Sequence, residues 1–198
     1  MKHLALALAL ACSCALALPA TPAAAADESS EAIIAAAKAA EAGAADLRET
    51  FGRTSLRNGQ FVWKKGRETS PIDRVVVDIT HQVAYVYGDD DELLAASTIS
   101  SGTSQNPSPH GIFEILEKKR MHRSIRYDNA PMPFMQRIDD YGIALHAGHL
   151  PGRPASHGCV RLPAEFASRL FAATQVGTRV LMGKPAILAD LRRRGYRV

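Results

Sequence analysis

The strongest constraint on the fold is a period-two alternation of apolar and polar residues that begins near residue 72. Every second residue is apolar over 75–79 and again over 83–87, and the 80–82 segment between them is polar. This alternation is typical of β-strands, because successive side chains of an extended chain point to opposite faces. It predicts two strands joined by a turn. Apolar runs bounded by turn residues predict further strands over 94–99, 111–116 and 179–182.

Helical signals flank this region. Residues 27–48 are rich in alanine, the residue with the highest helix propensity, but contain few bulky apolar side chains. We interpret this segment as a solvent-exposed spacer, in preference to a helix that binds a partner. Residues 49–70 have the composition of a linker, in which Phe61 and Trp63 can dock on the folded domain. Pro163 is positioned to open a second helix.

The length of 198 residues suggests one folded domain with appendages. We expect a secretory signal peptide at 1–26, an alanine-rich helix and linker at 27–70, a single domain at 71–183, and a C-terminal tail with a short helix at 184–198. The predicted fold class is mainly β with short helices.

The first 26 residues have the three parts of a secretory signal. Lys2 begins a short basic region, residues 4–18 are apolar, and the alanines at 24–26 form a cleavage site. We therefore expect export to the cell envelope, in the periplasm, and no transmembrane span after cleavage. Cys12 and Cys14 lie inside the signal and are expected to leave with it. The alternative is lipoprotein processing, in which one of these two cysteines is acylated.

Removal of the signal leaves one cysteine, Cys159, so an intramolecular disulfide is excluded. A single cysteine in an exported protein is a free thiol that is either reactive or buried. The net charge of +4 is spread along the chain, apart from the arginines at 192–194. Such dispersed charge lacks the basic stripe of a nucleic-acid binder, and we expect no nucleic-acid partner.

The chemistry is concentrated between residues 141 and 162, in YGIALHAGHLPGRPASHGCVRL. Cys159 has His157 two residues before it and His146 thirteen residues before it. A thiol beside imidazoles is suited to nucleophilic acyl transfer, since the thiolate is the reactive form and a histidine can accept its proton. Two other readings remain open: a small buried cysteine, and a zinc site that adds His149 to these three residues.

The SHGCVRL run, with IALHAG upstream of it, resembles the active-site signature of the L,D-transpeptidases, the YkuD family. The resemblance extends upstream through APMPFMQRIDDYG and covers residues 72 to about 183. The short separation between His146 and Ser156 is similar to proteobacterial-type envelope members, and differs from mycobacterial-type members with a longer insertion. The resemblance implies a YkuD-like mixed β-sandwich with a single catalytic domain.

The candidate roles fall into three groups. Cys159 is the candidate nucleophile, and His146 is the candidate base and acid. The supporting candidates are His157 as a pocket imidazole or, alternatively, a structural hydrogen-bonding residue of the turn, the amides of Gly158 and Cys159 as oxyanion donors, and Ser156 as a hydrogen-bonding residue of the turn. The family resemblance adds the Ala147 backbone carbonyl as the group that orients His146. It also implies substrate-binding roles for Arg161, Met132 and Phe134, and leaves His110 without an inherited role. A structural salt bridge remains the alternative for Arg161, and an ordinary core position the alternative for Met132 and Phe134.

The resemblance implies an exported cysteine L,D-transpeptidase that acts on peptidoglycan stem peptides. Cys159 would attack the bond between diaminopimelate and D-alanine and pass the acyl group to an amine. That amine would belong to a second stem, giving a 3–3 cross-link, or to a lysine of an envelope protein. No cofactor or metal is expected, and we expect a monomer. The alternatives are hydrolysis of the same thioester, as an L,D-carboxypeptidase or amidase, and a non-catalytic wall-binding module.

Overall fold

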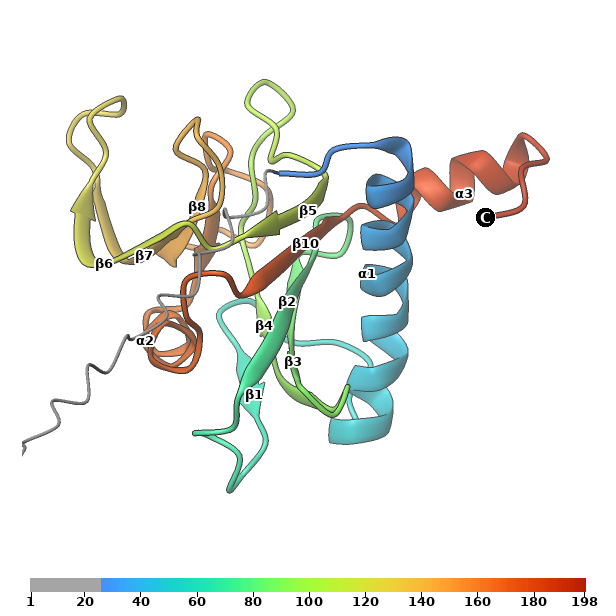
Figure 1. Ribbon diagram of the computed structural model, residues 1–198, viewed down its shortest axis with the longest axis horizontal. Helices are drawn as coiled ribbons and strands as arrows, with labels where there is room; N and C mark the ends of the chain where they lie inside the picture. Colours follow the sequence, from blue (N-terminus) through green and yellow to red (C-terminus); the bar gives the residue numbers. More distant parts are fainter. Residues whose placement is uncertain (1–25) are drawn as a thin grey trace, which may run out of the picture.

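The computed structural model describes residues 26–198, so the predicted signal peptide, with Cys12 and Cys14, lies outside the described residues except for Ala26. Two mixed sheets form the body of the domain (Figure 1). The first has the order β1-β4-β3-β2-β10-β5, with strands Phe61–Trp63 (β1), Ile72–Asp78 (β2), Val83–Gly88 (β3), Leu93–Thr98 (β4), Gly111–Glu114 (β5) and Arg179–Gly183 (β10). The expected mainly β fold with short helices is confirmed.

The second sheet has the order β6-β7-β8-β9. Its strands are Glu117–Arg123 (β6), Pro131–Arg137 (β7), Ala144–Ala147 (β8) and Val160–Leu162 (β9). All its neighbours are antiparallel except β8 and β9, which run parallel, as β2 and β10 do in the first sheet. The helices are α1 (Ser30–Phe51), α2 (Ala164–Ala173) and α3 (Ala186–Arg193).

The main core lies between the two sheets and α2. Val75 and Val77 of β2, Leu145 of β8, and Phe166 and Leu170 of α2 are among its fully buried members. The alternation predicted for β2 thus places one set of valines in this core. Phe61 and Trp63 do dock on the domain, because both rings lie within 6 Å of the Phe166 ring, at 5.6 and 5.7 Å. The segment expected to be linker therefore contributes an edge strand.

The alanine-rich segment is not a solvent-exposed spacer, and that interpretation was wrong. Helix α1 begins after Ser29, whose hydroxyl accepts the Ala32 N–H, and it lies along the outer face of the six-stranded sheet (Figure 1). Ala36 and Ala40 are completely buried there, in a second core with Val76 and Tyr85. The alanines are a packing surface, because small side chains let the helix backbone approach the sheet closely.

Gly183 shows how close this approach is. A Cβ atom at Gly183 would lie 2.2 Å from the Ala36 carbonyl oxygen and 2.7 Å from the Ala40 Cβ, so backbone would have to move. We expect Gly183→Ala to reduce the free energy of unfolding by about 1–3 kcal/mol, the usual cost of overpacking. Urea unfolding of the variant and wild type measures this difference. An unchanged midpoint would show that α1 does not rest on β10 as described.

Within residues 26–198, no helix is both long enough and apolar enough to cross a membrane.

Candidate active site

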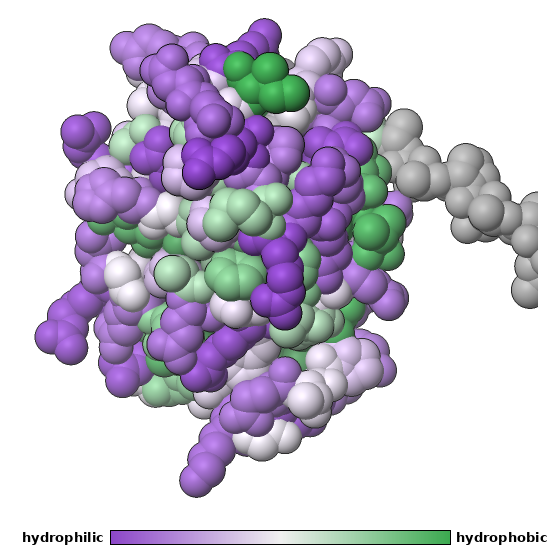
Figure 2. All heavy atoms as spheres, turned by 90° about the vertical axis from the view of Figure 1, so that its left-hand side faces the viewer, coloured by the Kyte–Doolittle hydropathy of each residue, from purple (hydrophilic) through white to green (hydrophobic). Residues whose placement is uncertain are grey.

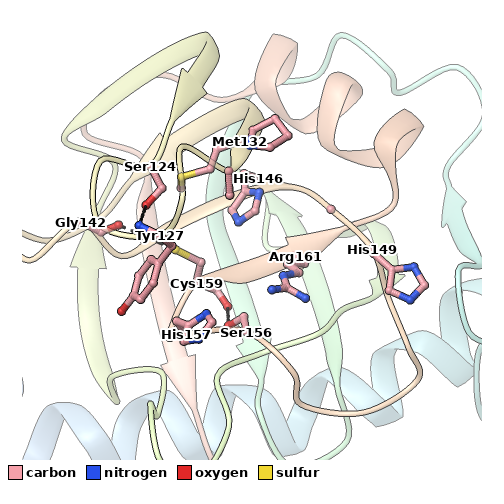
Figure 3. Close-up of a pocket in the computed structure, with 13 residues that line it drawn as sticks. Ser124, Tyr127, Met132, Gly142, His146, His149, Ser156, His157, Cys159 and Arg161 are labelled. Carbon is pink, nitrogen blue, oxygen red and sulfur yellow. Dashed lines mark hydrogen bonds between the residues drawn. The ribbon is translucent and has the colours of Figure 1, made fainter.

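Strands β8 and β9 bring the candidate base and the candidate nucleophile into one cavity. They pair in parallel with His146 opposite Arg161, and Cys159 immediately precedes β9. The cavity has a volume of about 310 Å³ and opens beside the β6–β7 hairpin. Figure 3 shows Cys159, His146, His157 and Arg161 around it. His146 and Cys159, which are thirteen residues apart in sequence, thus lie on neighbouring strands.

Hydrogen bonds fix the turn that carries the thiol. The Ser156 hydroxyl donates to the Cys159 carbonyl and accepts the Gly158 N–H at 3.1 Å. From another loop, the buried Ser108 hydroxyl donates to the Gly158 carbonyl at 2.7 Å and accepts the Gly102 N–H at 2.9 Å. These bonds hold the turn from both sides, which predetermines the direction in which the Cys159 side chain leaves the backbone.

The expected oxyanion role of the Gly158 amide does not fit this structure, because that N–H is bonded to Ser156. Gly158 has instead a conformational role. Its φ is +113°, and an added Cβ would lie 2.5 Å from the Ile143 Cδ1 atom, so a side chain is excluded by backbone geometry and by space. The Cys159 amide remains the candidate oxyanion donor.

The thiol is held in its neutral form. It donates to the Gly142 carbonyl, with 3.8 Å between Sγ and oxygen. Burial raises the pKa of Cys159 above its ordinary value of 9.0, and the negative charge of Asp139 adds to this. A hydrogen bond from the Ala144 N–H and the positive charge of Arg161 act in the opposite direction and only partly offset it. Activation of this thiol therefore requires a base.

The candidate base is buried and already oriented. His146 is 7 % exposed, and its Nδ1 lies 2.8 Å from the Ala147 carbonyl. Because a carbonyl can only accept, Nδ1 carries the hydrogen and Nε2 has the free lone pair. Burial lowers the pKa of His146 below its ordinary value of 6.5, the Ala147 bond opposes this shift, and the charges of Arg161 and His122 add to it. The imidazole is thus neutral at neutral pH and able to accept a proton.

These two opposite pKa shifts define the resting state. A raised thiol pKa and a lowered imidazole pKa both favour the neutral pair over a thiolate–imidazolium ion pair. In Figure 3 the sulfur points towards Gly142, whose carbonyl accepts the thiol hydrogen bond. Catalytic hydrogen bonds are often loose before substrate binds. The geometry supports general-base activation at the moment of attack.

Asp139 is a buried carboxylate near the thiol, and the sequence motif assigned it no role. It is 7 % exposed, and its Oδ1 accepts the Tyr141 N–H at 3.0 Å and the Ile143 N–H at 2.8 Å. These bonds fix the turn between β7 and β8, whose Gly142 carbonyl accepts the thiol proton. The carboxylate therefore orders the backbone around the sulfur and also opposes thiolate formation.

We expect Asp139→Asn to make the thiol more reactive, because the amide oxygen can keep both turn hydrogen bonds while the negative charge is lost. Alkylation of Cys159 by iodoacetamide at pH 7–8, followed on the peptide that contains it, should be several-fold faster than in wild type. Asp140→Asn is the matched control, since that neighbouring carboxylate is 94 % exposed. Equal rates in all three proteins would contradict the assignment.

Two of the three substrate-binding candidates line the cavity. Met132 and Arg161 line the cavity, and Arg161 forms no ion pair with any carboxylate of residues 26–198. Phe134 is not among the residues that line it: its ring packs on Phe171 of α2, with centroids 5.9 Å apart, in agreement with the core alternative. Phe134 has a left-handed backbone (φ 56°), which is uncommon for a non-glycine residue. This backbone conformation turns the Phe134 side chain away from the direction of the Met132 side chain.

The hairpin between β6 and β7 supplies cavity residues that the sequence did not indicate. Ser124, Tyr127 and Ala130 line the cavity, and the Tyr127 ring stacks on His157 with centroids 4.3 Å apart. His157 is exposed at the cavity rim. No local pattern identifies this hairpin, because β6 is polar and highly charged and has no apolar alternation.

The zinc hypothesis finds no geometric support. No three histidine, cysteine, aspartate or glutamate side chains in the described part of the chain are grouped so as to hold a metal ion. His149 lines the cavity but lies apart from Cys159 in Figure 3.

The two sheets and this cavity define a class of mainly β domain in which one thiol shares an open cavity with a buried, oriented histidine. Comparison with protein families gives a match to the YkuD family, the L,D-transpeptidase catalytic domain, over residues 72–182. The match covers more than half of the chain. The chain therefore belongs to the YkuD family, as its sequence motif predicts.

Solved structures have the same fold. An L,D-transpeptidase from Stackebrandtia nassauensis is 23% identical, with a TM-score of 0.53 over 71% of this chain and 66% of that one. An L,D-transpeptidase from Mycobacterium smegmatis is 20% identical (TM-score 0.52, 56% of this chain and 58% of that one). L,D-transpeptidase 3 from Mycobacterium tuberculosis, in complex with a faropenem-derived adduct, is 22% identical (TM-score 0.52, 57% and 61%).

The matched region spans less than two thirds of each of these three chains. No curated protein matches the sequence.

Proposed function

We propose that this protein is an exported cysteine L,D-transpeptidase that acts on peptidoglycan stem peptides. The observation that carries the proposal is the arrangement of Cys159 and His146 in one cavity, with the Ala147 carbonyl fixing the imidazole tautomer, in a chain of the YkuD family. Export is proposed from the signal-like sequence of residues 1–26, and N-terminal sequencing of the protein from the periplasm tests it.

The first half-reaction forms a thioester. His146 Nε2 takes the thiol proton as Cys159 Sγ attacks the carbonyl carbon of the diaminopimelate–D-alanine bond. We assign the Cys159 amide as the donor that stabilises the oxyanion that develops. The carbon–nitrogen bond then breaks, and the leaving amine of D-alanine receives the proton from the imidazolium. Enzyme and acyl group remain joined through sulfur, and the histidine is neutral again.

The second half-reaction returns the free thiol. An acceptor amine attacks the thioester carbonyl, loses a proton to His146, and forms a new amide bond while Cys159 leaves and is reprotonated. The acceptor amine belongs to a second diaminopimelate or to a protein lysine. Because Arg161 has a cavity position and no ion-pair partner among the described residues, its guanidinium is suited to bind a substrate carboxylate.

The test is incubation of the purified protein with a disaccharide-tetrapeptide. We expect loss of D-alanine from the donor, a covalent intermediate on the peptide that contains Cys159, and a cross-linked dimer. A tripeptide product without dimer would identify water as the acceptor, and therefore a carboxypeptidase. Absence of both products and of any adduct would reject the enzymatic function and leave wall binding as the remaining candidate.

A further inference from the structure

The β6 strand and the hairpin that follows it form a basic edge beside the cavity. β6 lies at the end of its sheet and pairs with β7 alone among the described strands. Residues 117–128 include five lysines and arginines but only two acidic residues. We call residues 119–126 the basic edge. This side of the molecule faces the viewer in Figure 2 and is mostly hydrophilic.

Most of the charge on the basic edge is not neutralised. Arg120 and Arg126 form no ion pair with a carboxylate anywhere in residues 26–198, and Arg123 donates to the Asn129 carbonyl at 3.1 Å. Some arginines elsewhere do bind carboxylates: Arg179 lies 2.7 Å from Asp73, and Arg192 makes two bonds to Glu41. Exposed arginines without an acidic partner also occur elsewhere in residues 26–198, at Arg48, Arg53 and Arg57, so what distinguishes the basic edge is that its free guanidinium groups lie together beside the cavity.

The basic edge is continuous with the cavity. Ser124 and Tyr127, which line the cavity, flank Ile125 and Arg126, and Ile125 is 99 % exposed. A chain that lies along β6 would therefore reach the cavity mouth directly, and it would meet the uncompensated guanidinium of Arg161 inside. Opposite charge along this path would both attract and orient such a chain.

We propose that the basic edge binds the carboxylate-bearing acceptor stem peptide and directs its amine to the acyl-enzyme. This inference rests on the proposed function. Diaminopimelate carries carboxylates close to its reactive amine, so it matches a row of free arginines. The edge lies outside the cavity that the donor occupies, which leaves it for the second substrate. An anionic membrane is the less suitable occupant, because large apolar groups exposed on the edge are limited to Met121 and Ile125.

The test compares wild type with Arg120→Gln/Arg123→Gln/Arg126→Gln. The matched control is Arg48→Gln/Arg53→Gln/Arg57→Gln, which removes the same charge from exposed arginines that likewise form no ion pair among the described residues. Acylation by a carbapenem reports the first half-reaction and should be unchanged in both variants. Transfer to a diaminopimelate-containing tripeptide should show a KM roughly tenfold higher in the β6 variant alone, with loss of its dependence on ionic strength.

A second arm measures binding without catalysis, by calorimetry of the same tripeptide on each protein carrying Cys159→Ala. Weaker binding in the β6 variant alone supports the basic edge even if no transfer is detected, so this arm separates the two proposals. Equal KM and equal binding in all proteins would overturn the inference. So would equal losses in both variants, or charge-dependent binding to phosphatidylglycerol vesicles without any effect on the tripeptide. If the β6 variant instead self-associates, the arginines serve to prevent edge pairing between copies.

Discussion

Cys159→Ala is expected to abolish acylation and transfer, with a loss of about four orders of magnitude or more in kcat/KM. The reason is that the other hydroxyl groups of the cavity, on Ser124, Tyr127 and Ser156, are much weaker nucleophiles than a thiol, and the Ser156 hydroxyl already donates to the Cys159 carbonyl. Intact mass after incubation with a carbapenem measures the effect directly. Wild type should gain the mass of one inhibitor, located on the peptide that contains Cys159, and the variant should gain none.

Cys159→Ser provides the control for shape. The hydroxyl occupies nearly the same volume but is a much weaker nucleophile, so the variant should keep the wild-type melting temperature and acylate slowly or not at all. An adduct that persists in Cys159→Ala, at the wild-type rate, would place the nucleophile elsewhere.

His146→Gln is expected to lower kcat/KM by roughly 10²- to 10⁴-fold, the usual contribution of a general base. The loss should exceed that from a pure binding residue, because the thiol pKa is raised and the neutral thiol needs a proton acceptor. The amide can keep a hydrogen bond to the Ala147 carbonyl, so folding should be retained. Rates of acylation at pH 7, with thermal unfolding as the check on structure, measure this effect.

The pH profile tests the same assignment without a substitution. Activity requires neutral His146, and its lowered pKa means that the neutral form persists below pH 6.5. The acid limb of kcat/KM in wild type should therefore lie below pH 6.5, and the His146→Gln variant should lack it. In that variant the remaining rate should rise with pH towards alkaline values, as the thiolate forms unaided. An acid limb near pH 6.5 or above in wild type would contradict the buried, neutral base.

The sequence predicted those elements whose signal is local. Period-two alternation identified β2 and β3, because each of these strands places apolar side chains in a buried layer. It failed for β6, an edge strand exposed along most of its length, where no burial selects apolar residues. The interpretation of α1 from its composition was also wrong. The low bulk of alanine was taken to mean that nothing is buried, whereas the close packing of α1 at Gly183 requires small side chains.

The same distinction between local signals and tertiary packing applies to the candidate site. The sequence by itself determined the chemical groups, because the SHGC run and the IALHAG run upstream of it are short local motifs that identify Cys159 and His146. Only the tertiary structure decided their protonation, since the pKa shifts arise from burial and from charges such as Asp139 and Arg161. It also decided that Phe134 belongs to the core and that Tyr127 and the basic edge adjoin the cavity. Those relations depend on how strands distant in sequence pair and pack, which no local pattern records.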